Sequence, residues 1–418
     1  MVLVFMPFSF GGSKKRIFGM KFGSFSKMFF GVILSLIAVC IFPDLIQAST
    51  WRVERDGSGD FTTIQPAVDG AAPGDTILVG PGDYIESASV VIEGWSQPTD
   101  VFVNVTVADL TFIGTSSDEV RIGPDEFYST YQGPVGFSYG NMSGTLRIEN
   151  VSILNVGKGS YSHFGRLEAV GCVFENIKFH GTLSLSPNGL FVDQCSFVGL
   201  ESEYAILTFP PCTGVVIQNC EFVNGDISLN SASDVVMENC TSFDDGQSQY
   251  ISGGIQLDNC DGRISHCEFT GHKAFCVAAI GGSNVQMENC TLIADGYVNS
   301  SVGLHAWSSS NVDVSNCIIE GTFSSFYIRS NAQVTVDSCH INTTGLWSVY
   351  ADSYGGPPID MDFTNNYWGT IETDLIDSKI LDSNDDSNLS LTIIYDPIIE
   401  TPIPTEKPTL GGFRAMYR

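Results

Sequence analysis

The chain has 418 residues, with 47 aspartate and glutamate against 19 lysine and arginine side chains, and a formal net charge of −28. This acidic composition excludes nucleic-acid binding as the function, because the chain repels phosphates and does not release their counterions. It also repels a polyanionic ligand unless a cation lies between the two.

An export signal is predicted over residues 1–48. Basic side chains between Lys14 and Lys27 precede the apolar run "MFFGVILSLIAVCIF" at 28–42, and the small residue Ala48 follows. The run is short for a membrane span, and a retained membrane anchor is the alternative. We expect a monomer that is secreted, periplasmic or at the cell surface, with no membrane contact once the signal is removed.

The segment "FTTIQPAVDGAAPGDTILVGPGDY" at 61–84 is predicted to cap the N-terminal end of a repetitive domain. Ile64, Ala67, Val68 and Ala71 have the spacing of one helix face, which indicates a short amphipathic helix. A cap is needed because a stack of strands leaves an exposed edge at each end.

A cysteine recurs after the same alternating apolar pattern, as in "VVIQNC", "VVMENC" and "VQMENC". The recurring cysteines are Cys172, Cys195, Cys220, Cys240, Cys267, Cys290, Cys317 and Cys339, at intervals of 20 to 27 residues. Val151 extends this column backwards and Asn366 extends it forwards. Such a period, with variable loops, is typical of a solenoid.

Three short strands are predicted in each period. Apolar residues lie three and five positions before the cysteine and two positions after it, so two strands meet at a corner formed by one turn residue. A third strand is predicted upstream, with inward residues eleven positions before the cysteine: Phe209, Leu229, Ala279, Ala306 and Ile328. No helical pattern separates these strands, and the repeat therefore predicts an all-β, single-stranded parallel β-helix.

The recurring cysteines are predicted to point inward and to stack along the interior. A thiol is small and apolar and needs no partner there. Side chains stacked in register rarely reach the dihedral angle of a disulfide, and the mature chain has an odd number of cysteines. We expect these thiols to be free and structural.

Two segments resemble a known superfamily. "DGSGDFTTIQPAVDGA" at 56–71 and "GDTILVGPGDYIE" at 74–86 resemble the start of secreted right-handed β-helix proteins of the pectin-lyase-like superfamily. The amino-acid sequence of these segments is most similar to that of pectin methylesterases, including their G-x-Y-x-E signature at Gly82, Tyr84 and Glu86. "NNYWGT" at 365–370 resembles the last coil of many bacterial β-helix proteins.

The resemblance implies a right-handed β-helix of about 11 coils over residues 49–370. We expect a C-terminal cap segment at 371–400 and a flexible tail at 401–418. The catalytic motifs of pectin methylesterases, polygalacturonases and pectate lyases are absent from the sequence. No family catalytic residue is therefore transferred to this chain.

The outward side chains of the upstream strand form the candidate site. In the superfamily this sheet lines the polysaccharide cleft, and aromatic rings stack on the apolar faces of sugars. The predicted substrate-binding residues are Trp307, Tyr327, Tyr350, Asp258 and Gln256. The alternative is that loops cover these side chains and that they form an outer core layer.

Arg329, His305 and Asp352 are the candidate catalytic residues. An eliminase would use Arg329 as base with calcium held by Asp258 or Asp352. A hydrolase pair of Asp258 and Asp352 is excluded, because several coils separate the two carboxylates and a glycosidase tolerates about 9.5 Å at most.

A calcium loop at 383–388 is disfavoured, because Ser387 and Ile393 stand where such a loop needs glycine and glutamate.

Two functions are compatible with the sequence. The first is an exported β-helix protein that binds or processes extracellular polysaccharide, as a lyase or carbohydrate esterase if it is an enzyme. The second is a non-catalytic surface or adhesion solenoid. Calcium is the one cofactor that the residues suggest.

Overall fold

The computed structural model describes residues 48–402, apart from 93–94, 127–132, 142, 164, 186–187, 200–203, 210–211, 245–252, 296–300, 342–344 and 356. Residues 1–47, which carry most of the predicted export signal, and residues 403–418 of the predicted tail lie outside the described part. The compact unit that begins at Ala48 contains all of the described residues.

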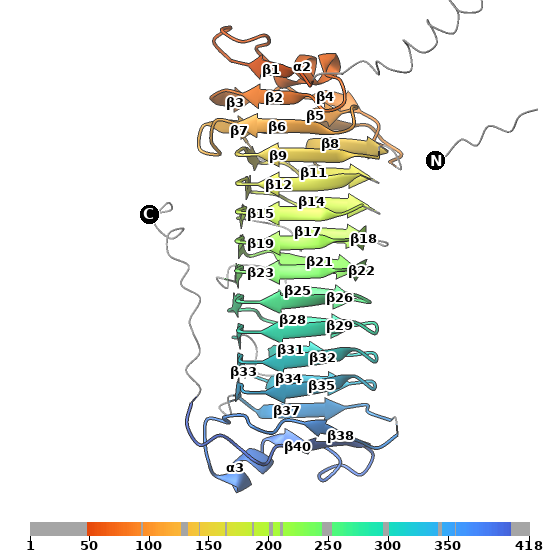
Figure 1. Ribbon diagram of the computed structural model, residues 1–418, viewed down its shortest axis with the longest axis vertical. Helices are drawn as coiled ribbons and strands as arrows, with labels where there is room; N and C mark the ends of the chain where they lie inside the picture. The colour runs from red at the N-terminus through yellow and green to blue at the C-terminus, as the bar shows by residue number, and fades with distance from the viewer. Residues whose placement is uncertain are drawn as a thin grey trace, which may run out of the picture. The chain divides into compact units, whose positions relative to one another are not determined.

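The described strands form three long sheets that run along one solenoid, and most coils contribute one strand to each sheet (Figure 1). Sheet A has 12 strands, sheet B has 11 and sheet C has 13 among the described residues. All neighbours within these sheets are parallel except β4 and β5, which pair antiparallel at one end of sheet C. The predicted parallel β-helix is confirmed, with about one coil more than the 11 expected.

The strands of sheet A are β1 (Thr50–Val53), β2 (Thr76–Val79), β6 (Leu110–Gly114), β9 (Thr145–Glu149), β12 (Arg166–Val170), β15 (Leu190–Asp193), β19 (Val215–Gln218), β23 (Val235–Glu238), β26 (Asp261–Ser265), β29 (Asn284–Glu288), β32 (Asn311–Ser315) and β35 (Gln333–Asp337). Those of sheet B are β3 (Gly82–Tyr84), β7 (Val120–Ile122), β10 (Ser152–Leu154), β13 (Val173–Glu175), β16 (Ser196–Val198), β20 (Glu221–Val223), β24 (Thr241–Phe243), β27 (Glu268–Thr270), β30 (Thr291–Ala294), β33 (Ile318–Gly321) and β36 (His340–Ile341).

The strands of sheet C are β4 (Ala88–Val90), β5 (Thr99–Val105), β8 (Val135–Asn141), β11 (Lys158–His163), β14 (His180–Leu185), β17 (Tyr204–Phe209), β21 (Asp226–Asn230), β25 (Gly253–Asp258), β28 (Phe275–Ile280), β31 (Val302–Ala306), β34 (Ser324–Arg329), β37 (Trp347–Asp352) and β39 (Ile380–Leu381). Two short pairs lie outside these sheets: β18 (Cys212–Thr213) with β22 (Ala232–Ser233), and β38 (Ile359–Asp362) with β40 (Leu391–Ile394).

The corner between sheets A and B depends on one residue in the left-handed region of φ. Asn219, Asn239, Asn289 and Asn316 each stand directly before a column cysteine, with φ between 53° and 54°. Asparagine tolerates this conformation better than most residues because its short polar side chain bonds locally. The recurring Asn–Cys pair is therefore a turn residue followed by an inward thiol.

The interior consists of ladders of like side chains. Phe174 stacks on Phe197 with ring centroids 4.6 Å apart, and Phe197 stacks on Phe222 at 5.0 Å. Gly159 and Gly181 lie beside these rings, and a Cβ on either glycine would approach a ring carbon to 2.6 Å. Glycine is required at both positions because the rings leave no room for a side chain.

The column cysteines are buried and free, as predicted, together with Cys212, Cys260 and Cys276. Although a thiol needs no partner, the column thiols make hydrogen bonds. The backbone N–H of Cys290 donates to Sγ of Cys317 at 3.3 Å, and the N–H of Cys317 donates to Sγ of Cys339 at the same distance. The turn residue interrupts the backbone ladder at the corner, and the thiol of the next coil accepts the N–H instead.

One inward residue predicted for the third strand is wrong. Leu229, Ala279, Ala306 and Ile328 are buried, but Phe209 is 43% exposed and Thr208 is buried in its place. Leu207 pairs with Ser228 and Val216 pairs with Val236, so this coil has one residue more between the two sheets than the next coil, and counting back from Cys220 reaches the wrong face.

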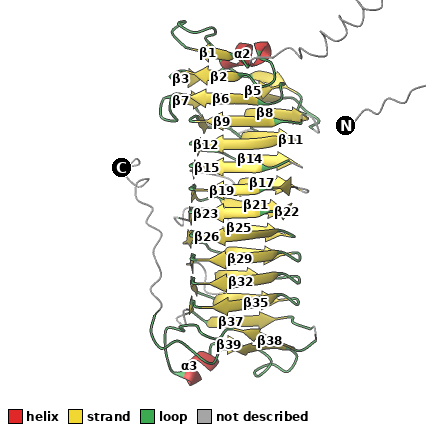
Figure 2. Cartoon of the chain, in the orientation of Figure 1, coloured by secondary structure: helices red, strands yellow, loops and turns green. Residues whose placement is uncertain are grey.

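Helices among the described residues lie only near the two ends (Figure 2). The predicted cap helix is α2 (Ile64–Gly70), and it buries Ile64, Ala67 and Val68. A second short helix, α3 (Thr373–Asp377), precedes β39. None of the described helices is long and apolar enough to cross a membrane.

The "NNYWGT" segment closes the interior column at the C-terminal end. Asn366 is fully buried and accepts a hydrogen bond from the backbone N–H of Cys339 at 2.7 Å. Its amide donates to the carbonyl of Val336 at 2.8 Å. Trp368 is also fully buried and packs against Phe363 and Tyr395. The forward extension of the column to Asn366 is confirmed.

Candidate functional site on sheet C

The outer face of sheet C carries the predicted site residues in two adjacent rows. His305 pairs in register with Tyr327, and Tyr327 pairs with Tyr350. Arg329 pairs with Asp352 in the second row. Trp307 follows β31 in line with this second row, and its backbone N–H donates to the carbonyl of Ala279 at 2.9 Å. The parallel strands therefore bring these six side chains together.

The rings of this group stack on one another. The His305 ring lies 4.7 Å from the Tyr327 ring and 6.0 Å from the Trp307 ring, and it is within 5° of parallel to both. Tyr327 and Tyr350 are 5.3 Å apart with planes tilted by 59°. The stacked ring faces of His305 and Tyr327 are therefore not available to a ligand. Trp307, at 37% exposure, is the most exposed ring of the group.

Arg329 lies over the rings and not in an ion pair with its register partner. Its guanidinium carbon is 4.7 Å from the Trp307 ring centroid and 5.7 Å from that of Tyr327. The Tyr327 hydroxyl donates to Oδ2 of Asp352 at 3.0 Å. Burial, and then this hydrogen bond, raises the pKa of Tyr327 to about 12. Asp352 thus holds the tyrosine, while the cation faces the tryptophan.

His305 is a neutral base at physiological pH. Burial, and then the positive charge of Arg329, lowers the pKa of His305 to about 4. Its Nε2 is buried and has no hydrogen-bond partner in the protein. A neutral imidazole beside a cation accepts a proton reluctantly, and at pH 7 it lacks the acidic proton that an imidazolium could transfer.

Gln256 and Asp258 lie on β25, on the same face but farther along the sheet. Gln256 pairs with Ala278, and Asp258 pairs with Ile280. Four strand steps separate β25 from β37, which at about 4.8 Å per step is roughly 19 Å. The structure thus does not bring Asp258 near Asp352, and the distance is incompatible with a glycosidase carboxylate pair.

Phe323 belongs to the same aromatic group, although sequence reasoning did not identify it. It lies in the connection before β34, and its ring contacts Tyr350 edge-on at 5.1 Å and Tyr327 at 6.1 Å. Connections between sheets B and C vary in length, so no fixed offset from the cysteine identifies this residue. We call Trp307, Tyr327, Arg329, Tyr350, His305 and Phe323 the lower cluster.

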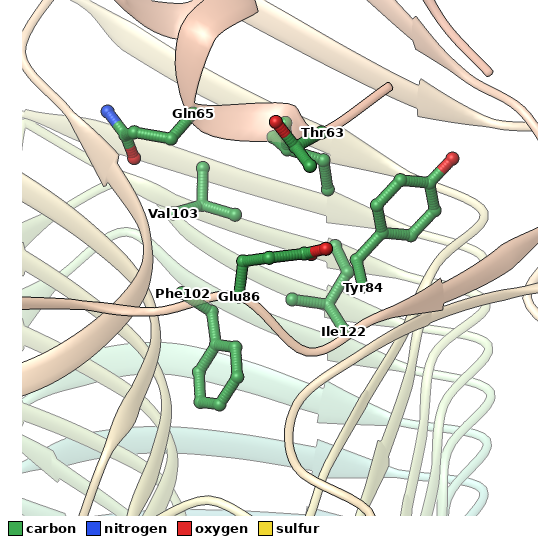
Figure 3. Close-up of a pocket in the computed structure, with 8 residues that line it drawn as sticks. Thr63, Gln65, Tyr84, Glu86, Phe102, Val103 and Ile122 are labelled. Atoms are coloured by element: carbon green, nitrogen blue, oxygen red, sulfur yellow. The ribbon is translucent and has the colours of Figure 1, made fainter. Parts of the chain in front are cut away.

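A small cavity of about 50 Å³ lies apart from this face, in the N-terminal cap (Figure 3). Glu86 and Tyr84 of the G-x-Y-x-E signature line it, together with Thr63, Gln65 and Phe102. The guanidinium of Arg55 binds Glu86 and lies 4.6 Å from the Tyr84 ring centroid. The Tyr84 hydroxyl donates to the carbonyl of Gly80 at 2.8 Å. These contacts give the signature a structural role in the cap.

Metal ligands do not converge in the described part of the chain, where no group of three histidine, cysteine or acidic side chains is arranged to hold a metal. In the 382–388 loop the carboxylate of Asp382 is buried. It accepts backbone hydrogen bonds from Asn384 at 2.7 Å and from Ile393 at 2.8 Å. This carboxylate therefore fastens the loop to β40.

Three parallel sheets, turned by a recurring corner and filled by stacked side chains, define the molecule as a parallel β-helix. The family model for the right-handed β-helix region matches residues 136–292 and 253–372. Together these ranges cover more than half of the chain, and the chain therefore belongs to the right-handed β-helix family.

Solved structures share this architecture at low sequence identity. A rhamnogalacturonan lyase is similar with a TM-score of 0.36 and 12% identity, over 73% of this chain and 83% of that chain. A pectate lyase has a TM-score of 0.33 and 13% identity, over 84% and 78%. The A-module of a mannuronan C-5 epimerase from Azotobacter vinelandii has 0.33 and 10%, over 78% and 91%. These likenesses concern the fold alone. No curated protein sequence is similar enough to count as a relative.

Proposed function

We propose that this chain is an exported polysaccharide-binding protein whose binding surface is the outer face of sheet C at the lower cluster. The observation that carries the proposal is the arrangement of Trp307, Arg329 and Tyr327, which combines an open indole ring, a cation and a phenol on adjacent strands. Aromatic rings and a guanidinium together suit the apolar faces and the polar edges of sugars.

The rigidity of the sheet supports binding at this position. β31, β34 and β37 are each hydrogen-bonded to parallel neighbours on both sides, so the side chains are held at fixed spacing. A tryptophan that remains 37% exposed on such a surface gains by covering its ring with a ligand. Gln256 and Asp258 extend the same face with groups that bond sugar hydroxyls.

Binding is better supported than turnover by the described residues. An elimination needs a proton acceptor, and a guanidinium group has no lone pair available to accept a hydrogen bond or a proton. Burial and Arg329 lower the pKa of His305 to about 4, which makes the imidazole a weak base. The geometry therefore favours a non-catalytic, polysaccharide-binding solenoid. Lyase or esterase activity would have to be demonstrated by an assay.

The first prediction tests the surface with Trp307→Ala. Affinity for a bound polysaccharide should fall several-fold, because one ring stacked on a sugar contributes about 1 kcal/mol. The measurement is titration calorimetry on a panel of acidic and neutral polysaccharides, with product analysis in the same samples to detect cleavage.

Phe243→Ala provides the matched control. Phe243 is a 46% exposed ring on sheet B, away from the proposed surface, and its removal should leave the affinity unchanged. Equal losses in the two variants, or no binding of any polysaccharide by the unaltered protein, would contradict the proposal.

A further inference from the structure

A second cluster of rings and one cation lies on the same face of sheet C. Lys158, His180 and Tyr204 are direct register partners on β11, β14 and β17. Trp95, from the segment between β4 and β5, lies with its ring 5.5 Å from that of Tyr161. The rings of His180 and Tyr204 are 6.0 Å apart. We call Trp95, Lys158, Phe179, His180 and Tyr204 the upper cluster.

Lys158 lies among the rings as Arg329 does in the lower cluster. Its Nζ is 4.4 Å from the Trp95 ring centroid and 5.0 Å from that of Phe179. Burial lowers the pKa of Lys158 to about 8, so most of the amine is still protonated at pH 7. A cation withdrawn from water in this way interacts strongly with an anion that approaches it.

The two clusters are similar in composition. In each, a cation lies over two rings, and a phenylalanine, Phe179 or Phe323, stands in the connection directly before a strand. Each also has a histidine on an adjacent strand. Burial, and then Lys158, lowers the pKa of His180 to about 4, as burial and Arg329 do for His305. Nδ1 of His180, like Nε2 of His305, is buried without a hydrogen-bond partner in the protein.

Small and polar side chains occupy part of the sheet C face between the clusters. Ser228, Gln256 and Ala278 follow one another along one row, and Asn230 and Asp258 lie in the next. Seven strand steps separate β11 from β34, which at about 4.8 Å per step is roughly 34 Å. Only a polymer of several sugar units reaches from one cation to the other.

We propose that the upper cluster is a second binding site for an acidic polysaccharide, and that one polymer chain spans both clusters along sheet C. This inference rests on the polysaccharide binding proposed above, and it adds a second site and a ligand class. Charge complementarity identifies the class. In a chain of net charge −28, each aromatic cluster is nevertheless built around a cation, which suits carboxylated sugars and not neutral ones.

The test uses oligomers of polygalacturonate and of alginate, graded in length, beside their carboxyl-reduced counterparts. The affinity of the unaltered protein should rise steeply once an oligomer is long enough to span both clusters, because the second contact becomes intramolecular. Carboxyl-reduced oligomers should lack this rise. Lys158→Met keeps the aliphatic packing and removes the charge, and it should reduce long-oligomer affinity at least tenfold, to the short-oligomer level.

Lys178→Met is the matched control. The Nζ of Lys178 lies 5.8 Å from the Phe179 ring centroid, so this variant removes a neighbouring charge without altering the cation over Trp95. It should bind long oligomers as the unaltered protein does. If Lys158→Met does not fold, Tyr204→Ala removes a half-buried ring of the same cluster and carries the same expectation.

The outcomes separate the inference from the proposed function. Unchanged long-oligomer affinity in Lys158→Met, with a loss in Trp307→Ala, would overturn the second site and leave the lower cluster as the binding surface. Equal loss of short-oligomer binding in both variants would also overturn it, because the two clusters would then form one site. Absence of any binding by the unaltered protein would overturn both.

Discussion

Ser242 interrupts a ladder of large side chains inside the solenoid. It pairs in register with Phe222 on one side and Phe269 on the other, and both rings are fully buried. The missing ring volume is filled by His272, from the corner after β27. Its Nε2 lies 3.1 Å from Oγ and 3.3 Å from the carbonyl oxygen of Ser242. A single small residue is thus compensated by a polar ring from the next coil.

This histidine should make folding stability depend on pH. Burial lowers the pKa of His272 to about 4, although Asp244 acts in the opposite direction; Lys273, the other charge nearby, lies 4.0 Å from Asp244. The unfolded pKa is about 6.5, so above pH 6.5 both states are neutral and stability is complete. Below it the unfolded chain binds a proton that the folded chain excludes, and stability falls. The loss by pH 4.5 should be roughly 2–3 kcal/mol.

Urea unfolding at pH 8 and pH 4.5 measures this loss. His272→Gln should reduce the difference between the two pH values by that amount, whatever its own effect at pH 8. His266→Asn changes an exposed histidine that stands in a turn with φ of 54°, and it should leave the difference unchanged. A pH dependence that is the same in all three proteins would show that His272 does not carry it.

At the scale of the coil, the corner between sheets A and B explains why cysteine recurs. A valine fills the same space, but it accepts no hydrogen bond from the corner N–H. The thiol of Cys317 accepts the N–H of Cys290 and donates to the carbonyl of Ser315 at 3.1 Å. Buried N–H groups without a partner cost about 1–3 kcal/mol each. The column cysteines therefore fill space in the interior and also accept hydrogen bonds at the corners. The side-chain amide of Asn366 takes the last position of the column.

The column should consist of unreactive, reduced thiols. Burial raises the pKa of Cys172, Cys220, Cys267 and Cys317, and all of the column thiols are buried. Thiol titration of the native protein should therefore be very slow. In denaturant without reductant, the eleven cysteines of the described chain should all react. If most of them resisted titration until a reductant was added, the stacked free-thiol column would be wrong.

The repeat could be predicted from sequence because its signals lie at fixed offsets. The corner residue, the cysteine and the flanking apolar positions keep their spacing, and the upstream strand keeps its offset in most coils, so the register of His305 with Tyr327 followed correctly from counting. Phe209 was misplaced because its coil has one residue more between β17 and β19 than the next coil has between β21 and β23. Trp95, Phe179 and Phe323 could not be found, because they lie in connections whose length varies and whose side chains pack by three-dimensional proximity alone.

The hydrogen-bonding of the thiols also lay beyond sequence reasoning. Alternation of apolar residues shows that a cysteine points inward, but it does not show which N–H the corner leaves without a backbone acceptor. That depends on the left-handed φ of the preceding residue and on the stacking of the next coil. The upper cluster was missed for a related reason, since Lys158 and His180 lie in coils where fewer residues follow the repeat.

The stability of the whole solenoid is the sum of the stabilities of its coils and of the contacts between neighbouring coils. Each strand pairs only with its counterparts in the coils on either side, so each coil is stabilised by its neighbours and the end coils depend on their caps. At the N-terminal end, α2 buries Ile64 and Val68 over the first coil. At the C-terminal end, Trp368 packs between Phe363 and Tyr395. Damage at one end should therefore remain local.

Trp368→Ala tests this local dependence. Removal of a fully buried indole should cost about 3–5 kcal/mol, and the loss should fall on the C-terminal coils because they have no further neighbour to hold them. Hydrogen exchange read by mass spectrometry should show faster exchange in β34, β37 and β39 and unchanged protection in β6, β9 and β12. Phe112→Ala removes a fully buried ring near the other end and should reverse the pattern. Uniformly faster exchange along all coils in either variant would mean that the solenoid unfolds as one cooperative unit, against the nearest-neighbour description.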